Sequence, residues 1–357
     1  MHDFLIIGGG IAGVSAAARL SHLGSVLLVE AEDHLAHHAS GRSAALFVKG
    51  YGAPPVVALN EASEDYLRHA NGGVLSPRGV LIVAKAAEAA AFEAEAAEMR
   101  AERLSPAEAR ARVPVLNPDR LAFAAFTPDA LDLDTDLLIQ NFAREARRNG
   151  EIVTRARVTA LRRAAGGWEA ETAQGAYAGR LLVNAAGAWA DGIARLAGAK
   201  PLGLTPLRRS MARIPAPGGH DLSAWPALFG AGDSWYAKPD AGALIVSPAE
   251  EDSMEPHDAW ADDMVLAEGL ARYEEMVTEP VTRLIASWAG LRTFAPDRVL
   301  AIGPDPVLPG FFWLAGQGGY GFQTSPAASR LAARLIGGSP PELAPATVAA
   351  LSPARFA

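Results

Sequence analysis

The first thirty residues contain two apolar runs, separated by a glycine-rich turn and a stretch of small residues. Residues 3–7 (DFLII) form a continuous apolar run, which is typical of a strand buried on both faces of a parallel sheet. Residues 11–24 (IAGVSAAARLSHLG) predict a helix of small residues that stops at Gly24, and residues 25–30 (SVLLVE) predict a second strand. The pattern therefore begins as strand, glycine turn, helix and strand.

Two helical regions follow with a different composition. Residues 86–113 are rich in Ala, Glu and Arg and predict surface helices that carry no catalytic or binding residue. The second of these helices is expected to begin at Ser105-Pro106. Residues 134–149 predict a capped amphipathic helix that ends at Gly150. A β-rich stretch comes next, and residues 235–248 (WYAKPDAGALIVSP) predict two strands joined by a Pro-Asp-Ala-Gly turn.

The last fifty residues return to small side chains. The run GQGGYG at 316–321 is too rich in glycine for a strand interior, and it precedes an expected helix start at Thr324-Ser325-Pro326. A helix N-terminus presents unpaired N–H groups and a positive dipole end, which suits an anionic group. The Pro-rich end after this helix is expected to be loosely ordered.

Composition and charge narrow the class of protein. The 357 residues are half hydrophobic and one-fifth charged, and the formal net charge of −8 disfavours nucleic acid or an anionic membrane as a partner. We find no signal peptide or spanning segment and expect a cytoplasmic protein without membrane insertion. Because the chain has no cysteine, disulfides, thiolate nucleophiles and cysteine-ligated metals are excluded, and no metal site is expected.

A dinucleotide fingerprint stands at the first turn. Gly8, Gly10 and Gly13 give G-x-G-x-x-G between a strand and a helix that opens with Ile11 and Ala12. The spacing allows a tight turn, a close approach of a pyrophosphate and tight helix packing, and Glu30 at the end of the second strand can accept ribose hydroxyls. FAD and NAD both satisfy this pattern. The position at residue 8 and the lack of a second fingerprint favour FAD.

Four further segments carry a resemblance to a known family. HHASGRSAA (37–45), NAAGAWAD (184–191), WAGLRTFAPD (288–297) and AGQGGYGFQTS (315–325) resemble the D-amino-acid oxidase superfamily of flavoproteins over essentially the whole chain. Within it the chain looks most like bacterial FAD-dependent D-arginine and D-amino-acid dehydrogenases. The resemblance implies an α/β fold, in which a Rossmann-type FAD domain is interleaved with an α+β substrate domain that contains a large antiparallel sheet. We assign 1–50, 135–200 and 300–357 to the FAD domain, and 51–134 and 201–299 to the substrate domain.

The resemblance also implies which residues surround a non-covalent FAD. Residues 40–44 run along the flavin and its pyrophosphate. Val158 lies at the adenine side, residues 185–189 lie over the diphosphate, and the glycine-rich residues 316–324 meet the pyrimidine edge of the flavin. Beyond the fingerprint residues these are Ala31, Ser40, Gly41, Arg42, Ser43, Ala44, Val158, Ala185, Ala186, Gly187, Trp189, Gly316, Gly318, Gly319, Tyr320, Gly321, Phe322, Gln323 and Thr324.

The implied substrate is an amino acid, whose carboxylate suits the planar fork of arginine. Arg292 aligns with the family's carboxylate position, and so does Arg209, for which a surface arginine is the alternative. Tyr236 and Tyr51 align with tyrosines of the family's substrate pocket. For each of them, packing in the core is the alternative role. The backbone of Gly319 and Tyr320 is expected to receive the amine, and no residue is nominated as a general base.

Departures from the family pattern bear on the substrate side chain. Where the arginine-specific relatives hold a histidine and an acid, this chain has Leu46 and Val80, so we predict a neutral or apolar D-amino acid. Lys49 in the pocket would favour acidic substrates, and Lys238 near the flavin could assist oxygen, as a lysine does in sarcosine oxidases. Exposure is the favoured interpretation of both lysines.

Two alternatives stay open at this point. One is an oxidase or dehydrogenase of secondary amines on the same fold, of the sarcosine, glycine or D-proline/hydroxyproline type. The other is a flavin-binding protein without amino-acid turnover, because a fold does not fix a function. The electron acceptor, which is O2, a quinone or another molecule, and the oligomeric state are not indicated by any motif.

Overall fold

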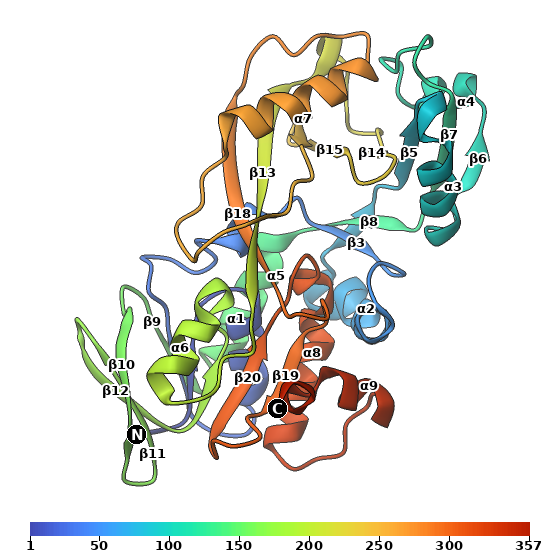
Figure 1. Ribbon diagram of the computed structural model, residues 1–357. Helices are drawn as coiled ribbons and strands as arrows, with labels where there is room; N and C mark the ends of the chain where they lie inside the picture. The colour runs from blue at the N-terminus through green and yellow to red at the C-terminus, as the bar shows by residue number, and fades with distance from the viewer.

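The computed structural model describes residues 1–357, and its strands form three sheets. An eight-stranded sheet lies in the lower half of Figure 1, and a nine-stranded sheet lies in the upper half. The third sheet, of three short strands, lies between them. It consists of β3 (Leu46–Val48), β4 (Leu75–Pro77) and β8 (Ala130–Leu133).

The eight-stranded sheet has a parallel centre, as the continuous apolar runs predict. The parallel strands, in spatial order, are β9 (Gly150–Val153), β2 (Val26–Val29), β1 (His2–Ile7), β12 (Gly175–Asn184) and β20 (Phe311–Ala315). The first half of β12 also pairs with the antiparallel strand β11 (Gly167–Thr172), which pairs in turn with β10 (Val158–Ala164), and β19 (Ala301–Pro304) pairs with β20. Segments far apart in sequence therefore meet at the carboxyl ends of β1, β12 and β2.

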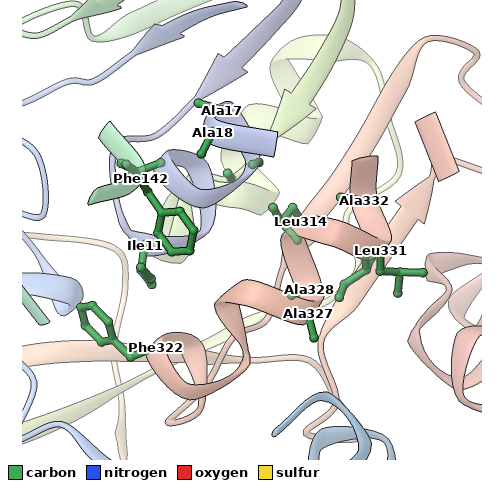
Figure 2. Close-up of a cluster of buried hydrophobic side chains, with 14 of the residues drawn as sticks. Ile11, Ala17, Ala18, Phe142, Leu314, Phe322, Ala327, Ala328, Leu331 and Ala332 are labelled. Carbon is green, nitrogen blue, oxygen red and sulfur yellow. The ribbon is translucent and has the colours of Figure 1, made fainter. Parts of the chain in front are cut away.

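Helices of small residues cover this sheet. α1 (Ile11–Leu20) packs against α5 (Thr135–Ala146) and α8 (Gly321–Ile336), and α2 (Pro54–His69) packs against α8. Figure 2 shows part of their shared core, where Phe142 and Phe322 fill the space beside the alanines of α1 and α8. α6 (Ala190–Ala197) contacts β10 and β12. None of the helices is both long and apolar enough to cross a bilayer.

The nine-stranded sheet is antiparallel at all but one of its pairings. Along the sheet the order is β17 (Asp252–Ser253), β13 (Thr205–Pro215), β16 (Ala243–Ser247), β15 (Trp235–Asp240), β14 (Ala227–Gly230), β5 (Val80–Ala84), β7 (Phe123–Thr127) and β6 (Glu102–Leu104). β18 (Ala286–Phe294) pairs with β13, and only β5 and β14 run parallel. α7 (Asp263–Glu275) packs on β15 and β16. α3 (Ala89–Glu98) packs on β5 and β7, and α4 (Pro106–Arg112) packs on β7.

Local chemistry confirms several boundaries. Asp134 caps α5 through the N–H of Leu137, although the helix ends at Ala146 rather than beside Gly150. Ser105 and Glu108 form the capping box that starts α4, as Ser105-Pro106 predicts. The β15–β16 hairpin turns at Ala241 and Gly242, both with positive φ, which suits the twist of the strands.

Three local predictions are wrong. α8 begins at Gly321 instead of Thr324, because the Ser325 hydroxyl donates to the Phe322 carbonyl (2.9 Å) and replaces the N–H that Pro326 lacks. The C-terminal segment is ordered, since α9 (Pro345–Leu351) packs on α2 and buries Leu351 completely. Residues 86–113 are not all helix, because β6 separates α3 from α4 and adds a strand to the sheet edge.

Candidate functional site

The turn between β1 and α1 is built for close approach. Gly8 has φ +108°, and a Cβ there would lie 2.4 Å from the Ala185 carbonyl oxygen, while a Cβ on Gly13 would lie 1.8 Å from the Gly8 oxygen. The N–H of Ile11 donates to Ser40 Oγ (3.0 Å), whereas those of Gly10, Ala12 and Gly13 have no partner within the protein. These free donors at a helix N-terminus suit the pyrophosphate of a dinucleotide.

Glu30 ends β2 with its carboxylate turned back over this turn. It accepts the N–H of Gly9 (2.5 Å) and the N–H of Glu32 (2.8 Å), and only 8% of the residue is exposed. Both carboxylate oxygens of Glu30 keep lone pairs free at the cavity wall. They can therefore accept hydrogen bonds from ribose hydroxyls, as the spacing predicts.

A cavity of about 220 Å³ follows the carboxyl ends of β1, β2 and β12. It contains most of the residues expected at the adenosine and diphosphate. Of these, Gly8, Gly10, Glu30, Ala31, Ser40, Arg42, Val158, Ala185, Ala186, Gly187 and Trp189 line it. Gly13 and Gly41 do not line it and act through packing, because a Cβ on Gly41 would lie 2.3 Å from the Ala36 carbonyl oxygen.

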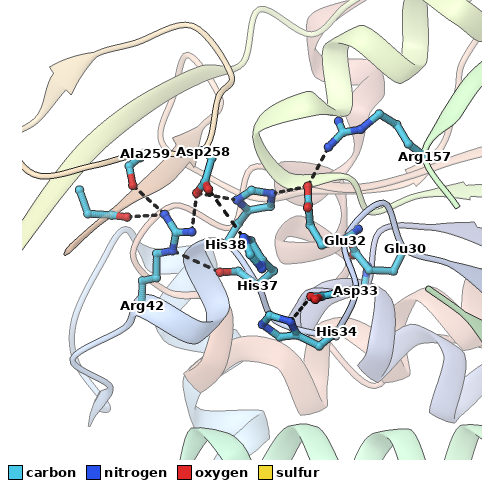
Figure 3. Close-up of polar contacts among 12 residues, drawn as sticks. Glu30, Glu32, Asp33, His34, His37, His38, Arg42, Arg157, Asp258 and Ala259 are labelled. Atoms are coloured by element: carbon cyan, nitrogen blue, oxygen red, sulfur yellow. Dashed lines mark hydrogen bonds and ion pairs between the residues drawn. The ribbon is translucent and has the colours of Figure 1, made fainter. Parts of the chain in front are cut away.

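A polar network closes the outer side of this cavity, as Figure 3 shows. Arg42 donates to the carbonyls of Ala259 (2.7 Å), Ala289 (2.9 Å) and His37 (3.2 Å), and it pairs with Asp258 (2.5 Å). All three guanidinium nitrogens are thus committed to protein partners. Arg42 therefore joins the 37–42 segment to the 258–259 loop of the other half of the molecule, a role that the resemblance alone did not predict.

The network continues through His38, which contacts Asp258 (3.7 Å) and the carboxylate of Glu32 (3.1 Å); Glu32 also pairs with Arg157 (2.7 Å). The His38 ring lies tilted beside Trp189 (4.6 Å between ring centres). Burial lowers the pKa of His38, so the imidazole is neutral at neutral pH. These residues form a fixed wall of the dinucleotide cavity.

The glycine-rich turn before α8 offers a second set of free donors. The N–H groups of Gln317, Gly319, Gly321, Phe322 and Gln323 have no partner within the protein. The buried side-chain nitrogen of Gln323 is also without a partner, while its oxygen accepts the N–H of Val48 (3.1 Å). Such orphaned donors suit the carbonyl-rich pyrimidine edge of a flavin.

These donors face a larger cavity of about 490 Å³ that adjoins the first. The two cavities share Gly10, Ala39, Ser40, Arg42, Ala185, Gly187, Gly290 and Leu291 as walls. Ile11, Ala12, Ser43, Ala44, Gly318, Gly319, Gly321, Phe322 and Gln323 line the larger cavity. Thr324 is completely buried and bonds the Tyr320 carbonyl instead (2.8 Å).

Two arginines project into the larger cavity from paired strands. Arg209 on β13 lies opposite Gly290 of β18, two residues before Arg292. The Nη2 of Arg292 lies 3.4 Å from the Tyr236 hydroxyl, and Arg209 lies 6.0 Å from the centre of the Tyr236 ring. Arg209 is only 9% exposed, so the surface alternative is wrong for it, whereas its neighbour Arg208 pairs with Asp252 outside the cavity.

The electrostatics of this pair favour an anion. Burial, and then the nearby charge of Arg292, lower the pKa of Arg209. Its carboxylate partner is Glu251 (3.2 Å), which is shared with Arg298 (2.9 Å). Of the two guanidinium groups that face the cavity, Arg209 shares Glu251 with Arg298, Arg292 has no carboxylate partner, and the Arg209 Nε is unbonded. A substrate carboxylate would supply the missing charge.

Tyr51 lies at the side of this cavity, whereas Tyr320, which was expected at the flavin and the substrate amine, packs against Tyr51 and does not line the cavity. Their rings are 5.4 Å apart and edge to face, and Tyr51 is 44% exposed and lines the cavity. Tyr320 is nearly buried and packs near Phe294. Lys49 turns away, half exposed, and pairs with Glu64 (2.9 Å), in agreement with the favoured interpretation.

The far wall of the cavity was missed from the sequence. α3 contributes Glu95 and Met99, which join Met211 and Phe229 opposite the glycine-rich turn. The expectation of a helix without chemistry is therefore wrong in part, because α3 packs on β5 and β7 and its inner edge reaches the cavity. Burial raises the pKa of Glu95 to about 7, and the carboxylate accepts the Gly232 N–H (3.1 Å).

Two further positions differ from expectation. Val80 is completely buried in β5 and does not line the cavity, whereas Leu46 does. Lys238 is only 9% exposed, so its predicted exposure is wrong, because β15 continues through Lys238 to Asp240 and turns its side chain toward the 44–45 segment.

A parallel sheet carries the dinucleotide turn, and a cavity with two arginines lies between it and an antiparallel sheet. This arrangement is that of a flavin-dependent oxidoreductase of the dinucleotide-binding type. The profile of the family described as "FAD dependent oxidoreductase" (DAO) matches residues 3–335. The chain therefore belongs to this family, and its cofactor is FAD. The free donors and the close glycines described above fit that cofactor.

Known relatives match most of the chain. The chain is 24% identical over 94% of its length to FAD-dependent oxidoreductase domain-containing protein 1 of Bos taurus, of which it covers 81%. It is 26% identical over 70% of its length to N-methyl-L-tryptophan oxidase of Shigella dysenteriae, of which it covers 73%. The structure superposes on glycine oxidase from Geobacillus kaustophilus with a TM-score of 0.83, 23% identity and 98% coverage of both chains. The narrower resemblance to D-arginine dehydrogenases stays a prediction.

Proposed function

We propose that the protein oxidises a D-amino acid with a neutral or apolar side chain to the 2-oxo acid and ammonia. The observation that carries the proposal is the pair Arg209 and Arg292, with Tyr236, in a cavity that adjoins the dinucleotide cavity. The chemistry that bound FAD would supply is acceptance of the hydride from the substrate Cα. Hydrolysis of the resulting imino acid by water then releases ammonia.

The residues of the chain orient the substrate and control its charge. Arg292 and Arg209 hold the carboxylate, and the Tyr236 hydroxyl fixes the position of Arg292. The backbone of Gly319 lies beside Arg292 and receives the neutral amine, whereas the Tyr320 backbone is already bonded to Gln317 and Thr324. This orientation at the cofactor supplies the catalytic effect without a general base.

The side-chain preference rests on the wall formed by Leu46, Met211 and Phe229. Glu95, Glu98 and Asp233 also line this cavity, and a pKa of about 7 leaves Glu95 about half protonated at neutral pH and makes it a weak counter-charge for a cation. Burying a cationic side chain here without a full partner would cost about 1–3 kcal/mol.

A substrate panel tests the proposal. The holoenzyme is mixed anaerobically with D-leucine, D-phenylalanine, D-methionine, D-proline, D-arginine or D-lysine, and bleaching of the flavin absorbance is followed. We expect the neutral D-amino acids to reduce the flavin roughly tenfold faster than the cationic ones. Faster reduction by D-arginine or D-lysine would contradict the proposed side-chain preference. Admitting air afterwards shows whether O2 serves as acceptor.

A secondary amine is the second candidate substrate. The observation in its favour is the similarity to N-methyl-L-tryptophan oxidase, a relative whose name specifies an N-methylated amino acid. Adding glycine, sarcosine and other N-methyl amino acids to the same panel decides between the two candidate substrate classes. If the substrate is a secondary amine, these compounds should reduce the flavin faster than the D-amino acids do. No reduction by any amine would favour a flavin-binding protein without amino-acid turnover.

The titration of Glu95 gives a pH prediction for the same cavity. Its pKa is raised to about 7, so the neutral form that tolerates an apolar side chain dominates below that pH. We expect KM for a neutral substrate to rise as the pH passes through 7. Glu95→Gln should remove this step while leaving other pH effects, including that of the substrate amine. The same KM profile in Glu95→Gln and the wild type would contradict this role of Glu95.

A further inference from the structure

Lys238 is a buried lysine in the wall of the larger cavity. Its ammonium group donates to the carbonyls of Ala44 (2.6 Å) and Ala45 (3.1 Å), and it pairs with Asp132 Oδ1 (3.0 Å). A lysine is seldom buried unless its charge has partners of this kind. The three contacts join β15 of the nine-stranded sheet, β8 of the small sheet and the 44–45 segment.

Asp132 is shared with a second cation. The Nε of Arg78 donates to Asp132 Oδ2 (2.7 Å), and its Nη1 donates to the Trp225 carbonyl (2.8 Å). Neither Lys238 nor Arg78 forms an ion pair with another carboxylate. Two cations with one carboxylate leave this triad of Lys238, Asp132 and Arg78 with a net charge of about +1.

The triad acts at the part of the cavity that the 44–45 segment lines. Ala44, Ala45 and Lys238 all line the larger cavity, which is also lined by the glycine-rich turn before α8. Ala45 has φ +41°, a left-handed conformation that residues other than glycine rarely adopt, and the ammonium group fixes the carbonyls on both sides of it. Both the position of this segment and the local charge therefore depend on Lys238.

We propose that Lys238 is a positioning residue which, through the Asp132 and Arg78 triad, sets the reduction potential of the bound flavin. A net positive charge beside the cavity favours the reduced flavin, which carries more negative charge than the oxidised one, and partial burial strengthens the interaction. The inference rests on FAD binding in this cavity and is independent of the substrate proposed above.

The midpoint potential of the holoenzyme, measured by equilibration with a redox dye in the absence of any amine, tests this inference. We expect Lys238→Met to lower the potential and Asp132→Asn to raise it, because the first removes a positive charge and the second a negative one. A tenfold change in the ratio of reduced to oxidised flavin at a fixed dye ratio corresponds to about 30 mV for two electrons. Lys238→Arg should stay close to the wild type.

The matched control is Lys49→Met, because Lys49 is a half-exposed lysine four residues after Ala45 that lies outside the cavity wall. Its potential should not change. A purely structural role of the triad would move Lys238→Met and Asp132→Asn in the same direction or move neither beyond the control, and either result would overturn the proposal. If Lys238→Met does not retain FAD, Asp132→Asn decides, since an unchanged or lowered potential contradicts the proposed effect of charge.

Discussion

Replacement of Arg292 by methionine should lower kcat/KM for the preferred amino acid by roughly two to three orders of magnitude. The change removes one of the two guanidinium groups that line the cavity and that we propose to bind the substrate carboxylate, and losing one partner of a buried charge pair costs about 2–5 kcal/mol. Steady-state kinetics, together with the rate of anaerobic flavin reduction, measure the effect. Arg292→Lys should recover part of it, because lysine restores the charge without the bidentate fork.

Arg213 provides a control for this prediction. It lies on β13, the strand that carries Arg209, but its guanidinium pairs with Asp240 (3.1 Å) and does not reach the cavity. Arg213→Met should therefore keep kcat/KM close to that of the wild type. Equal losses in Arg292→Met and Arg213→Met, or an unchanged Arg292→Met, would refute the assignment of Arg292 to the substrate.

Replacement of Gly13 by alanine should abolish FAD binding. The new Cβ would lie 1.8 Å from the Gly8 carbonyl oxygen, and both groups are backbone-anchored, so α1 must move away from the turn that holds the pyrophosphate. Overpacking of this kind costs about 1–3 kcal/mol of stability in addition to the lost cofactor. The flavin absorbance of the purified protein and its thermal unfolding report the two effects.

Gly192 is the matched control for this substitution. It is also a glycine within a helix, α6, but a Cβ there meets no atom within 4 Å. Gly192→Ala should retain the full flavin content and be neutral or slightly stabilising, since alanine has the higher helix propensity. Normal FAD binding by Gly13→Ala would show that the close contact at the turn is not required.

The sequence predicts those parts of the molecule in which backbone geometry dictates the residue. Gly8 and Gly13 stand where the chain approaches itself most closely, so a short pattern was enough to place the turn, the helix and Glu30. The continuous apolar runs likewise placed the first two parallel strands, β1 and β2. Arg292 was found through a family motif, and the structure places it in the larger cavity with its Nη2 3.4 Å from the Tyr236 hydroxyl.

Contacts between distant segments left no such pattern. Glu95 stands in a helix whose composition is that of any solvated surface, and only the packing of α3 on β5 and β7 brings it to the cavity. Lys238 was expected to be exposed because lysine usually is, and its partners come from residues 44, 45 and 132. Val80 was placed at the pocket by alignment, although a strand central to the sheet keeps it in the core.

The shared walls of the two cavities couple the cofactor to the integrity of the fold. Residues from positions as far apart as Gly10, Ser40, Ala185 and Gly290 meet there, and an unfolded chain cannot present them together. FAD therefore binds the folded state alone and adds RT ln(1 + [FAD]/Kd) to its stability, about 2.7 kcal/mol at a hundredfold excess over Kd. Cofactor supply in the cell thus becomes a determinant of how long the chain survives proteolysis.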